Sequence, residues 1–396
     1  MVNKRNKILI LGAGRQQIPL ISTAIKMQLE VHVCSILGDY PGIEIAPYFH
    51  EVDISDSKAV LELAKSIEIQ GIITTGTDVC LESIGLVIDR LNLPGTCLES
   101  SKSCLNKTLM KARFSRFNVP TANYTLIDSV ESGTEFFNSQ TSACVIKPAD
   151  SSGSRGVNRI EMGTEIHAAL VDARKYSASG EIIIEEWLEG EEFGAQAIII
   201  DGKLEKLMLH SDITTPPPRR IPIGHGCPHP AESELMPMVW SIVEHAVSAL
   251  GIDNTISNID FILTEDGPKI IEMTCRMGGT HLPEVCGTFW GIDMYETALQ
   301  IALGMQPVLP QSPLGVPNAI QNLIFDQPGK VAKLGDTDQE FVWNLYFGVG
   351  DYVVLNAAKQ AELGYVQDTT SDVGSLLQSV TNAAEAFCNT TEYEVD

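Results

Sequence analysis

Residues 143–157, Ala-Cys-Val-Ile-Lys-Pro-Ala-Asp-Ser-Ser-Gly-Ser-Arg-Gly-Val, have the composition of an anion-binding site. An apolar run that predicts a buried strand ends at Lys147 and gives way to a loop of small residues containing Gly153 and Gly156. Small residues allow backbone N–H groups to approach an anion, serine hydroxyls add donors, and Lys147 and Arg155 supply positive charge. The pattern predicts a phosphate site, and a surface hairpin with two ordinary cations is the alternative.

Residues 256–274 supply carboxylates at the spacing of a metal site. Two apolar runs flank the sequence Thr-Glu-Asp-Gly-Pro, which predicts a β-hairpin in which Leu263 pairs with Lys269. Counting outward from that pair places Asp260 opposite Glu272 on one face of the sheet. Facing carboxylates repel each other, so a fold that keeps them together normally has a cation between them or a proton shared by them. Oxygen ligands of this kind suit Mg²⁺, and an exposed hairpin with solvated acids is the alternative.

The composition of the whole chain limits what can surround these two stretches. With 396 residues, the chain is long enough for two or three domains with their own cores. A net charge of −24 argues against a nucleic-acid surface and against binding to anionic membranes, so a phosphate site must be a local concentration of Lys and Arg. The nine cysteines lack paired zinc-type spacing, which favours reduced thiols in a cytoplasmic protein. We expect no signal peptide, because the apolar run near the N-terminus is short, and no membrane span.

Residues 7–95 predict a small α/β unit with a parallel sheet, because short apolar runs alternate with amphipathic segments. The expected strands are 7–11, 30–34 and 71–75, and the expected helices are 16–27 and 79–90. A glycine turn follows the first strand, but Gln17 occupies the third glycine position of a dinucleotide fingerprint and no acid follows the second strand. We therefore expect this unit either to form a wall of the site or only to pack, with no ligand of its own.

Residues 100–192 predict the elements around the phosphate loop. The expected elements are a helix at 103–117, strands at 124–127 and 181–188, and a helix at 165–177. Lys107 and Lys111 lie one turn apart on the first helix, a spacing that usually marks a solvated face. The last strand runs into acids that end at Glu192, which would ordinarily form a charged loop but could also hold an adenine and its ribose hydroxyls.

Four motifs in this order closely resemble the ATP-grasp superfamily, and more narrowly its carboxylate–amine ligase branch, which includes the L-amino acid ligases. They are also similar to the carbamoyl-phosphate-synthase-like and purine carboxylase members. The motifs are Asn-Lys-x-x-Met-Lys at Lys107, Val-Ile-Lys-Pro-Ala-Asp-x-x-Gly-Ser-Arg-Gly-Val at Lys147, Glu-Glu-Trp-Leu-x-Gly-x-Glu ending at Glu192, and Asp260 with Glu-Met-Thr-x-Arg-x-Gly-Gly from Glu272. The resemblance covers nearly the whole chain.

The fold class that the resemblance implies is a mixture of α/β and α+β, built as an ATP-grasp fold. A Rossmann-like pre-ATP-grasp domain is expected at residues 1–99, and the ATP-grasp domain at 100–310, with a mobile lid at about 115–187. A small C-terminal subdomain is expected at 311–396.

The resemblance also implies a role for each matched residue. ATP would be held by Lys107, Lys147, Ser152, Gly153, Ser154, Gly156, Glu185, Glu192 and the backbone of Glu186 and Leu188. Mg²⁺, or Mn²⁺ in its place, would be bound by Asp260, Glu272 and Thr274. Catalysis would rest on Lys147, Arg155 and Arg276, and substrate contacts on Arg220, His225, Arg276, Gly278 and Gly279.

The implied reaction is phosphoryl transfer from ATP to a small carboxylate, followed by attack of an amine on the acyl phosphate and release of ADP and phosphate. A bicarbonate-using carboxylase or carbamoyl-phosphate-type enzyme is one alternative, and a catalytically silent nucleotide-binding subunit or sensor is another. Small-molecule carboxylate and amine substrates and a homodimer are the partners that the resemblance implies.

Two positions depart from the pattern of the family. Thr274 stands where the family usually has Asn, which puts the number of metal ions in question and keeps the silent alternative open. Pro222 stands where the amino acid ligases tend to have an acid that can receive a substrate ammonium, three residues before a His that matches His225. The expectation of a free α-amino acid substrate is weaker for that reason.

Overall fold

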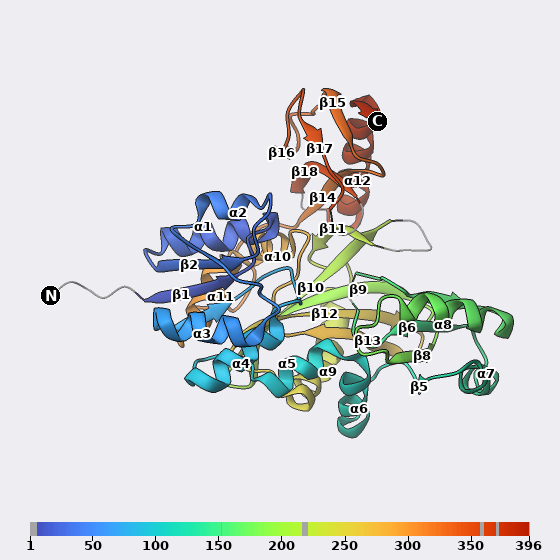
Figure 1. Ribbon diagram of the computed structural model, residues 1–396. Helices are drawn as coiled ribbons and strands as arrows, with labels where there is room; N and C mark the ends of the chain where they lie inside the picture. Colours follow the sequence, from blue (N-terminus) through green and yellow to red (C-terminus); the bar gives the residue numbers. More distant parts are fainter. Residues whose placement is uncertain (1–5, 152, 216–220, 357–359, 370–371, 396) are drawn as a thin grey trace. The chain divides into compact units, whose positions relative to one another are not determined.

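The computed structural model describes residues 6–151, 153–215, 221–356, 360–369 and 372–395 (Figure 1). The chain divides into two compact units whose segments alternate along the sequence. The first unit comprises Met1–Leu207, Ser233–Gly279 and Met294–Leu309, and the second comprises Met208–Glu232, Thr280–Asp293 and Pro310–Asp396. The three-domain division expected from the sequence stays a prediction.

The first unit begins with a parallel sheet in the strand order β3-β2-β1-β4, which confirms the α/β organisation predicted for this part of the chain. The strands are β1 (Lys7–Leu11), β2 (Glu30–Ser35), β3 (Tyr48–Glu51) and β4 (Gly71–Ile73). The accompanying helices are η1 (Arg15–Gln17), α1 (Ile18–Lys26), α2 (Pro41–Ile45), α3 (Ser57–Ile67) and α4 (Leu81–Leu91). Helix α3 was not predicted from the sequence, although Asp56 caps it by accepting bonds from two backbone N–H groups.

A second sheet of the first unit carries the predicted phosphate loop, in the strand order β5-β8-β6-β7. Its strands are β5 (Tyr124–Ile127), β6 (Cys144–Pro148), β7 (Asn158–Ile160) and β8 (Ile182–Glu186). The remaining elements of this part are α7 (Val130–Ser139), η2 (Gly163–Glu165) and α8 (Ile166–Arg174). Residues from α8 and from all four strands form one buried apolar cluster. The loop between β6 and β7 is therefore held at both of its ends by a packed core.

A single helix predicted at 103–117 is in fact two helices, so that prediction is wrong. These are α5 (Leu98–Leu105) and α6 (Lys107–Phe117). Asn106 lies between them in an extended conformation, and its side chain accepts a bond from the N–H of Leu109. Because an Asn that caps a helix N-terminus satisfies an otherwise unpaired donor, α6 begins at Lys107.

Antiparallel strands β13-β12-β9-β10 complete the sheets of the first unit. Their limits are β9 (Glu191–Ile200), β10 (Lys203–Thr214), β12 (Thr255–Thr264) and β13 (Gly267–Thr274), and β10 continues into the second unit. The helices α9 (Glu232–Leu250) and α11 (Met294–Ala302) also belong here, and α11 contacts both α1 and β12.

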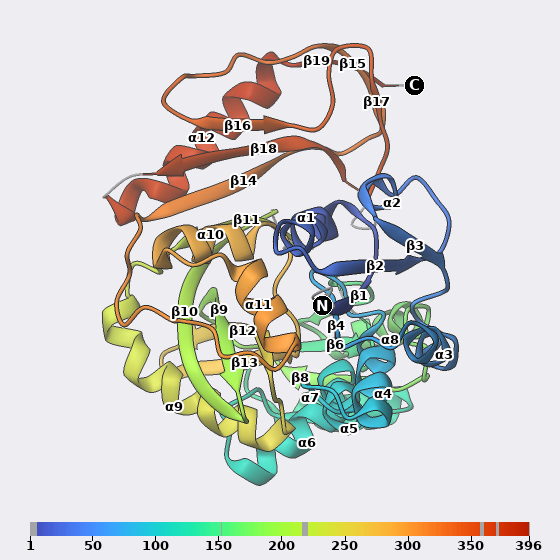
Figure 2. The same cartoon turned by 90° about the vertical axis from the view of Figure 1, so that its left-hand side faces the viewer.

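The second unit is built on the strand order β10-β11-β14-β18-β16. Its further strands are β11 (Pro222–Cys227), β14 (Asn318–Phe325), β16 (Val342–Leu345) and β18 (Ala361–Thr369), and β17 (Tyr352–Val353), β15 (Gly329–Lys333) and β19 (Glu392–Val395) form a separate small sheet. Helix α12 (Val373–Thr390) packs on β14 and β18, and α10 (Leu282–Trp290) packs on β11 (Figure 2).

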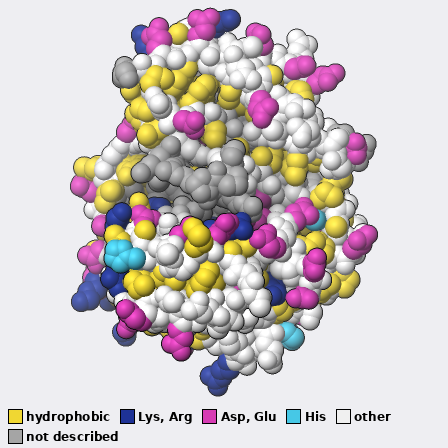
Figure 3. All heavy atoms as spheres, turned by 90° about the vertical axis from the view of Figure 1, so that its right-hand side faces the viewer, with side chains coloured by type: hydrophobic (Ala, Val, Ile, Leu, Met, Phe, Trp, Pro, Cys, Tyr) yellow, Lys and Arg dark blue, Asp and Glu magenta, His cyan; other side chains and the backbone are white. Residues whose placement is uncertain are grey.

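The surface carries many acidic side chains, as expected from the net charge of −24. Asp and Glu side chains are spread over the face shown in Figure 3, with separate Lys and Arg side chains among them. In the described part of the chain, no helix combines the length and the apolar character that crossing a bilayer requires.

Candidate functional site

The hairpin of β12 and β13 brings the two predicted metal-binding carboxylates together. Asp260 pairs directly with Glu272, which confirms that prediction. The predicted pairing of Leu263 with Lys269 is wrong, because the turn is tighter and Leu263 pairs with Pro268. A bulge adds one residue to β13 and so compensates for the shorter turn: Phe261 pairs with residue 270, whereas Asp260 pairs with residue 272.

A chain of amides orients Asp260. Asn258 lies two residues earlier on the same face of β12, and its Nδ2 donates to Asp260 Oδ1 at 2.9 Å. Gln196 on β9 pairs with Asn258 and donates from its Nε2 to Asn258 Oδ1 at 2.6 Å. The side-chain oxygen of Gln196 accepts a bond from the N–H of Gly278 at 3.0 Å. Sequence reasoning missed both amides, although the two-residue spacing from Asp260 was a signal for Asn258.

Lys107 connects the phosphate loop with the carboxylate pair. It is the first residue of α6, its side chain is buried, and its backbone N–H bonds to the carbonyl of Ala149 at 2.8 Å. Its Nζ donates to the carbonyl of Ser151 at 2.7 Å and to Glu272 Oε1 at 3.2 Å. One ammonium group thus contacts both stretches that the sequence identified separately.

A buried ion cluster lies behind the phosphate loop. Lys147 Nζ and Lys111 Nζ approach Glu185 Oε1 at 3.0 and 3.3 Å, and all three residues are at most 5% exposed. Lys111 also donates to Thr121 Oγ1 at 2.7 Å and lies over the ring of Tyr124. The interpretation of Lys107 and Lys111 as a solvated face is therefore wrong, because both side chains point into the protein.

Burial and charge act against each other in this cluster. Burial lowers the pKa of Lys111 to about 8, although Glu185 opposes the change. Burial alone would raise the pKa of Glu185, but the attraction of Lys147 and Lys111 outweighs it and holds that pKa below its usual value. Glu185, which the resemblance placed at adenine and ribose, is a carboxylate shared by two lysines in this structure.

The loop after β6, where the sequence predicts a phosphate site, contains three residues in the left-handed backbone region. Gly153, Ser154 and Gly156 all have positive φ, at 65°, 56° and 72°. Gly156 is buried, and a Cβ there would lie 2.9 Å from Tyr176 and 3.0 Å from Pro148, so this position requires glycine. Gly153, Ser154 and Arg155 are exposed, whereas Ser152 lies outside the described residues.

The predicted nucleotide-holding residues continue along β8 and β9. Glu186 binds the backbone and side chain of Asn123 at 3.0 and 3.1 Å, and lies 3.6 Å from Lys269, so its carboxylate is structural. Leu188 is partly exposed after the strand ends. Glu192 shares a face of β9 with Gly194, which pairs with Asp260, so the predicted ribose acid and the predicted metal acid face the same side of the sheet.

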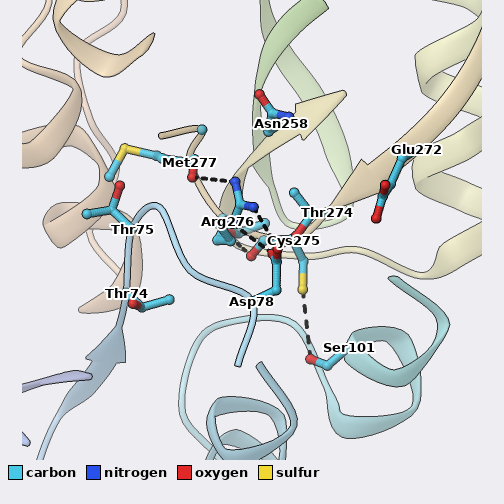
Figure 4. A network of polar contacts seen from close by, with 12 residues as sticks. Thr74, Thr75, Asp78, Ser101, Asn258, Glu272, Thr274, Cys275, Arg276 and Met277 are labelled. Carbon is cyan, nitrogen blue, oxygen red and sulfur yellow. Dashed lines mark hydrogen bonds and ion pairs between the residues drawn. The ribbon is translucent and has the colours of Figure 1, made fainter. Parts of the chain in front are cut away.

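Arg276 is held by an acid that the sequence analysis did not identify. Its Nε and Nη2 donate to Asp78 Oδ1 and Oδ2 at 2.8 and 2.9 Å, and its Nη1 donates to the carbonyl of Met277 at 3.0 Å (Figure 4). Thr274, expected at the metal, donates its hydroxyl to Asp78 Oδ1 at 3.0 Å. Burial favours the neutral acid, but Arg276 outweighs it and lowers the pKa of Asp78.

Asp78 follows β4, so the N-terminal α/β part supplies the ion-pair partner of Arg276. No local signal marks Asp78, because its partners lie 196 and 198 residues away. Gln17, whose presence at the third glycine position argued against a dinucleotide site, has its side chain buried against Gly12 and donates to the carbonyl of Thr75. The other expected substrate glycine, Gly279, lies against the side chain of Gln16.

The remaining two substrate predictions fall elsewhere. Arg220 lies outside the described residues. His225 belongs to the second unit, where its Nδ1 lies 2.7 Å from Asp212 Oδ1. The first unit by itself collects the predicted lysines, the acid pair, the loop and Arg276, and an acid pair beside buried ammonium groups fits a magnesium-bound polyphosphate, whose charges both kinds of group can offset.

Part of the chain matches a known protein family. Residues 105–281 match the family model of the phosphoribosylglycinamide synthetase ATP-grasp (A) domain. An uncharacterized protein, y4rH, of Sinorhizobium fredii is 26% identical over 344 residues, which are 82% of this chain and 69% of that protein. A phosphoribosylamine–glycine ligase of Lactococcus lactis is 28% identical over 254 residues, 60% of this chain and 58% of the ligase. The chain thus spans little more than half the length of that ligase.

Two solved structures share the fold over the whole chain. Phosphoribosylglycinamide synthetase from Anaerococcus prevotii has a TM-score of 0.80 at 22% identity, covering 99% of this chain and 100% of that one. L-amino acid ligase from Bacillus licheniformis has a TM-score of 0.79 at 18% identity, covering 100% of both chains. At such identities the likeness shows a common fold, which is the mixed α/β fold that the sequence predicted.

Proposed function

We propose that this chain is a member of the ATP-grasp superfamily and an ATP-dependent carboxylate–amine ligase of the amino-acid or dipeptide-forming type. ATP and Mg²⁺ are the cofactors of this family. The observation that carries the proposal is the position of Lys107, whose Nζ contacts the phosphate loop at Ser151 and the metal-strand carboxylate of Glu272. A residue so placed can hold a phosphate of ATP next to the metal that neutralises it.

The proposed roles follow from the positions of the side chains. Lys107, Lys147 and the backbone of Gly153–Gly156 hold the phosphates, and Asp260 and Glu272 hold Mg²⁺, which would neutralise charge on the transferred phosphoryl group. Glu192 is proposed for the ribose hydroxyls. Glu185 positions Lys147 by an ion pair in the buried cluster.

Arg276 is proposed to face the substrate carboxylate or the transferred phosphate. Asp78 accepts hydrogen bonds from two N–H groups of Arg276, and the carbonyl of Met277 accepts a third, so the plane of the guanidinium is fixed. A guanidinium has five N–H donors, which leaves two for a ligand. Asp78 therefore orients Arg276 without saturating it.

The proposed reaction has two displacements. A carboxylate oxygen attacks the γ-phosphorus of ATP, and the bond from that phosphorus to the bridging oxygen breaks, which releases ADP. The amine nitrogen then attacks the acyl carbon, the bond from that carbon to the phosphate oxygen breaks, and the amine loses a proton. The products are an amide and inorganic phosphate, and no side-chain nucleophile is needed because positioning and charge neutralisation supply the catalysis.

The decisive experiment measures ADP and phosphate release from Mg-ATP with a panel of carboxylates, alone and paired with amines. Because Pro222 replaces the expected ammonium-binding acid, the panel includes carboxylates with and without an α-amino group. A parallel set contains hydroxylamine, which traps an acyl phosphate as a hydroxamate. Release that depends on one carboxylate, with trapping, supports the ligase.

Two other outcomes would replace the proposal. Stimulation by bicarbonate alone would assign a carboxylase or carbamoyl-phosphate-type reaction. ATP binding without turnover for any substrate would assign a silent nucleotide-binding protein. Glu272→Gln should abolish turnover, and the matched control is Glu265→Gln on the exposed turn of the same hairpin. A homodimer and a cytoplasmic location are further proposals, supported only by resemblance to the family.

A further inference from the structure

The hairpin of β10 and β11 collects two histidines and an aspartate on one face. His210 and Asp212 lie two residues apart on β10, so their side chains lie on the same side of the strand. His225 on β11 pairs directly with Asp212. All three residues belong to the second unit, and none of them is among the residues proposed above to hold ATP or Mg²⁺.

These side chains converge on a small volume. His210 Nδ1 lies 2.9 Å and His225 Nδ1 lies 2.7 Å from the same atom, Asp212 Oδ1. One potential ligand atom from each residue lies within 4.8 Å of the other two. His210 and His225 are 1% and 3% exposed, and the Asp212 side chain is 11% exposed. Among the described residues, the buried Nε2 of His225 has no hydrogen-bond partner.

The chemistry of this set differs from that of the acid pair at Asp260 and Glu272. Two imidazole nitrogens with one carboxylate oxygen are ligands that suit zinc and other divalent transition metals, whereas carboxylates alone suit magnesium. A buried carboxylate is unfavourable unless it is compensated. The two imidazoles can compensate Asp212 by donating from Nδ1, and a dication can do so instead while using the lone pairs of both imidazoles. The pattern His-x-Asp on one strand, with His on its partner, places the three side chains on two paired strands.

We propose that His210, Asp212 and His225 form a binding site for a divalent transition metal, with Zn²⁺ as the best-fitting ion. This assignment gives His225 a role as a metal ligand in place of the substrate contact that the resemblance implied. It does not depend on the proposed ligase reaction.

The test uses the full chain, freed of metal by a chelator, dialysed and held in excess Mg²⁺. Zn²⁺ is titrated in competition with a chromophoric chelator, and the bound metal is measured by mass spectrometry. One equivalent of Zn²⁺ per chain is expected. His210→Gln, Asp212→Asn and His225→Gln should each weaken Zn²⁺ binding by about 100-fold or more, since changes to residues that merely support a ligand already cost 10–100-fold.

Two control variants make the result specific. His245→Gln changes an exposed histidine of α9 and should keep the full Zn²⁺ affinity. Glu272→Gln removes a proposed Mg²⁺ ligand and should also keep it, so failure of the metal site and failure of the ligase proposal are distinguishable. Zn²⁺ binding below one equivalent in the wild type, or unchanged binding in the three triad variants, would overturn the site.

A spectrum of the wild type decides the case if a triad variant does not fold. Co²⁺ in place of Zn²⁺ should give visible ligand-field bands typical of nitrogen and oxygen ligands. Cys227 and Cys286 are buried thiols of the same unit. A strong thiolate-to-cobalt charge-transfer band would show that these cysteines bind the metal instead, and the absence of any cobalt band would show that the hairpin binds no metal; either result contradicts the proposal.

Discussion

Asp78 and Arg276 form a two-point ion pair across 198 residues of sequence, with Nε to Oδ1 at 2.8 Å and Nη2 to Oδ2 at 2.9 Å. Two parallel bonds fix both the position and the plane of the guanidinium, which a single contact would not do. Burial disfavours the charge of Arg276, but Asp78 outweighs it and raises the pKa of the guanidinium. The N-terminal α/β part thereby sets the orientation of an arginine proposed to touch the substrate.

Asp78→Asn should therefore impair both stability and catalysis. Removing one partner of a largely buried pair leaves the other charge uncompensated, and we expect a loss of about 3 kcal/mol in the free energy of unfolding. Turnover should fall because the guanidinium loses its fixed plane. Chemical denaturation and the ADP-release assay measure the two effects, with Glu82→Gln on the exposed side of α4 as the control. Unchanged turnover in a folded Asp78→Asn protein would contradict the positioning role.

Lys107→Met should lower kcat/KM for ATP by about 100-fold, the size typical for removal of one group that stabilises a charged transition state. The methionine keeps the aliphatic volume of the buried side chain and removes only the ammonium group. Steady-state kinetics with varied ATP measure the effect, and Lys102→Met, at a half-exposed lysine of α5, is the matched control. Equal kinetics for the two variants would show that Lys107 is only structural.

Gln196→Ala should weaken Mg²⁺ use without removing any proposed ligand. Gln196 orients Asn258, which in turn binds Asp260. Loss of such support typically costs 10–100-fold in metal affinity, so we expect the Mg²⁺ concentration for half-maximal rate to rise by about 10-fold or more. Excess Mg²⁺ should restore kcat. Gln378→Ala, at an exposed position of α12, serves as the control, and an effect that excess Mg²⁺ does not reverse would point to misfolding instead.

Lys111 should give stability a measurable dependence on alkaline pH. Its pKa is lowered from 10.5 to about 8 by burial, so between these values the unfolded chain binds more protons than the folded one. The free energy of unfolding therefore increases as the pH rises from about 8 to 10.5. Below that range, the contribution of Lys111 to this free energy is about 3 kcal/mol lower than above it. Lys111→Met should remove the increase, as measured by urea denaturation across pH. A wild-type slope that persists in Lys111→Met would refute the assignment.

The sequence predicted those features that depend on local periodicity. Apolar runs located β1, β2 and β5. Counting along the hairpin also placed Asp260 opposite Glu272, because the bulge offset the error made at the turn. Four motifs in order also predicted the fold, which the solved structures confirm.

The features that sequence reasoning missed depend on contacts between distant segments. Asp78 has no motif of its own, and its role exists only because the chain returns to it after nearly 200 residues. Lys111 was misinterpreted because a helical spacing of lysines cannot show that Glu185, far along the chain, neutralises one of them inside the core. The polarity of lysine predicted an exposed side chain, but the ion pair with a residue distant in sequence allows that side chain to be buried.

The bulge in β13 has a consequence for how related sequences should be aligned. Ile271 is the extra residue between Ile270, which pairs with Phe261, and Glu272, which pairs with Asp260. Because side chains alternate along a strand, deleting this one residue would turn Glu272 to the opposite face of the sheet. A shorter or longer turn would have the same effect unless the bulge changed with it. Insertions and deletions at the turn and at residue 271 should therefore occur together. An alignment that counts only from the turn will assign Glu272, the glutamate proposed to bind the metal, to the wrong column.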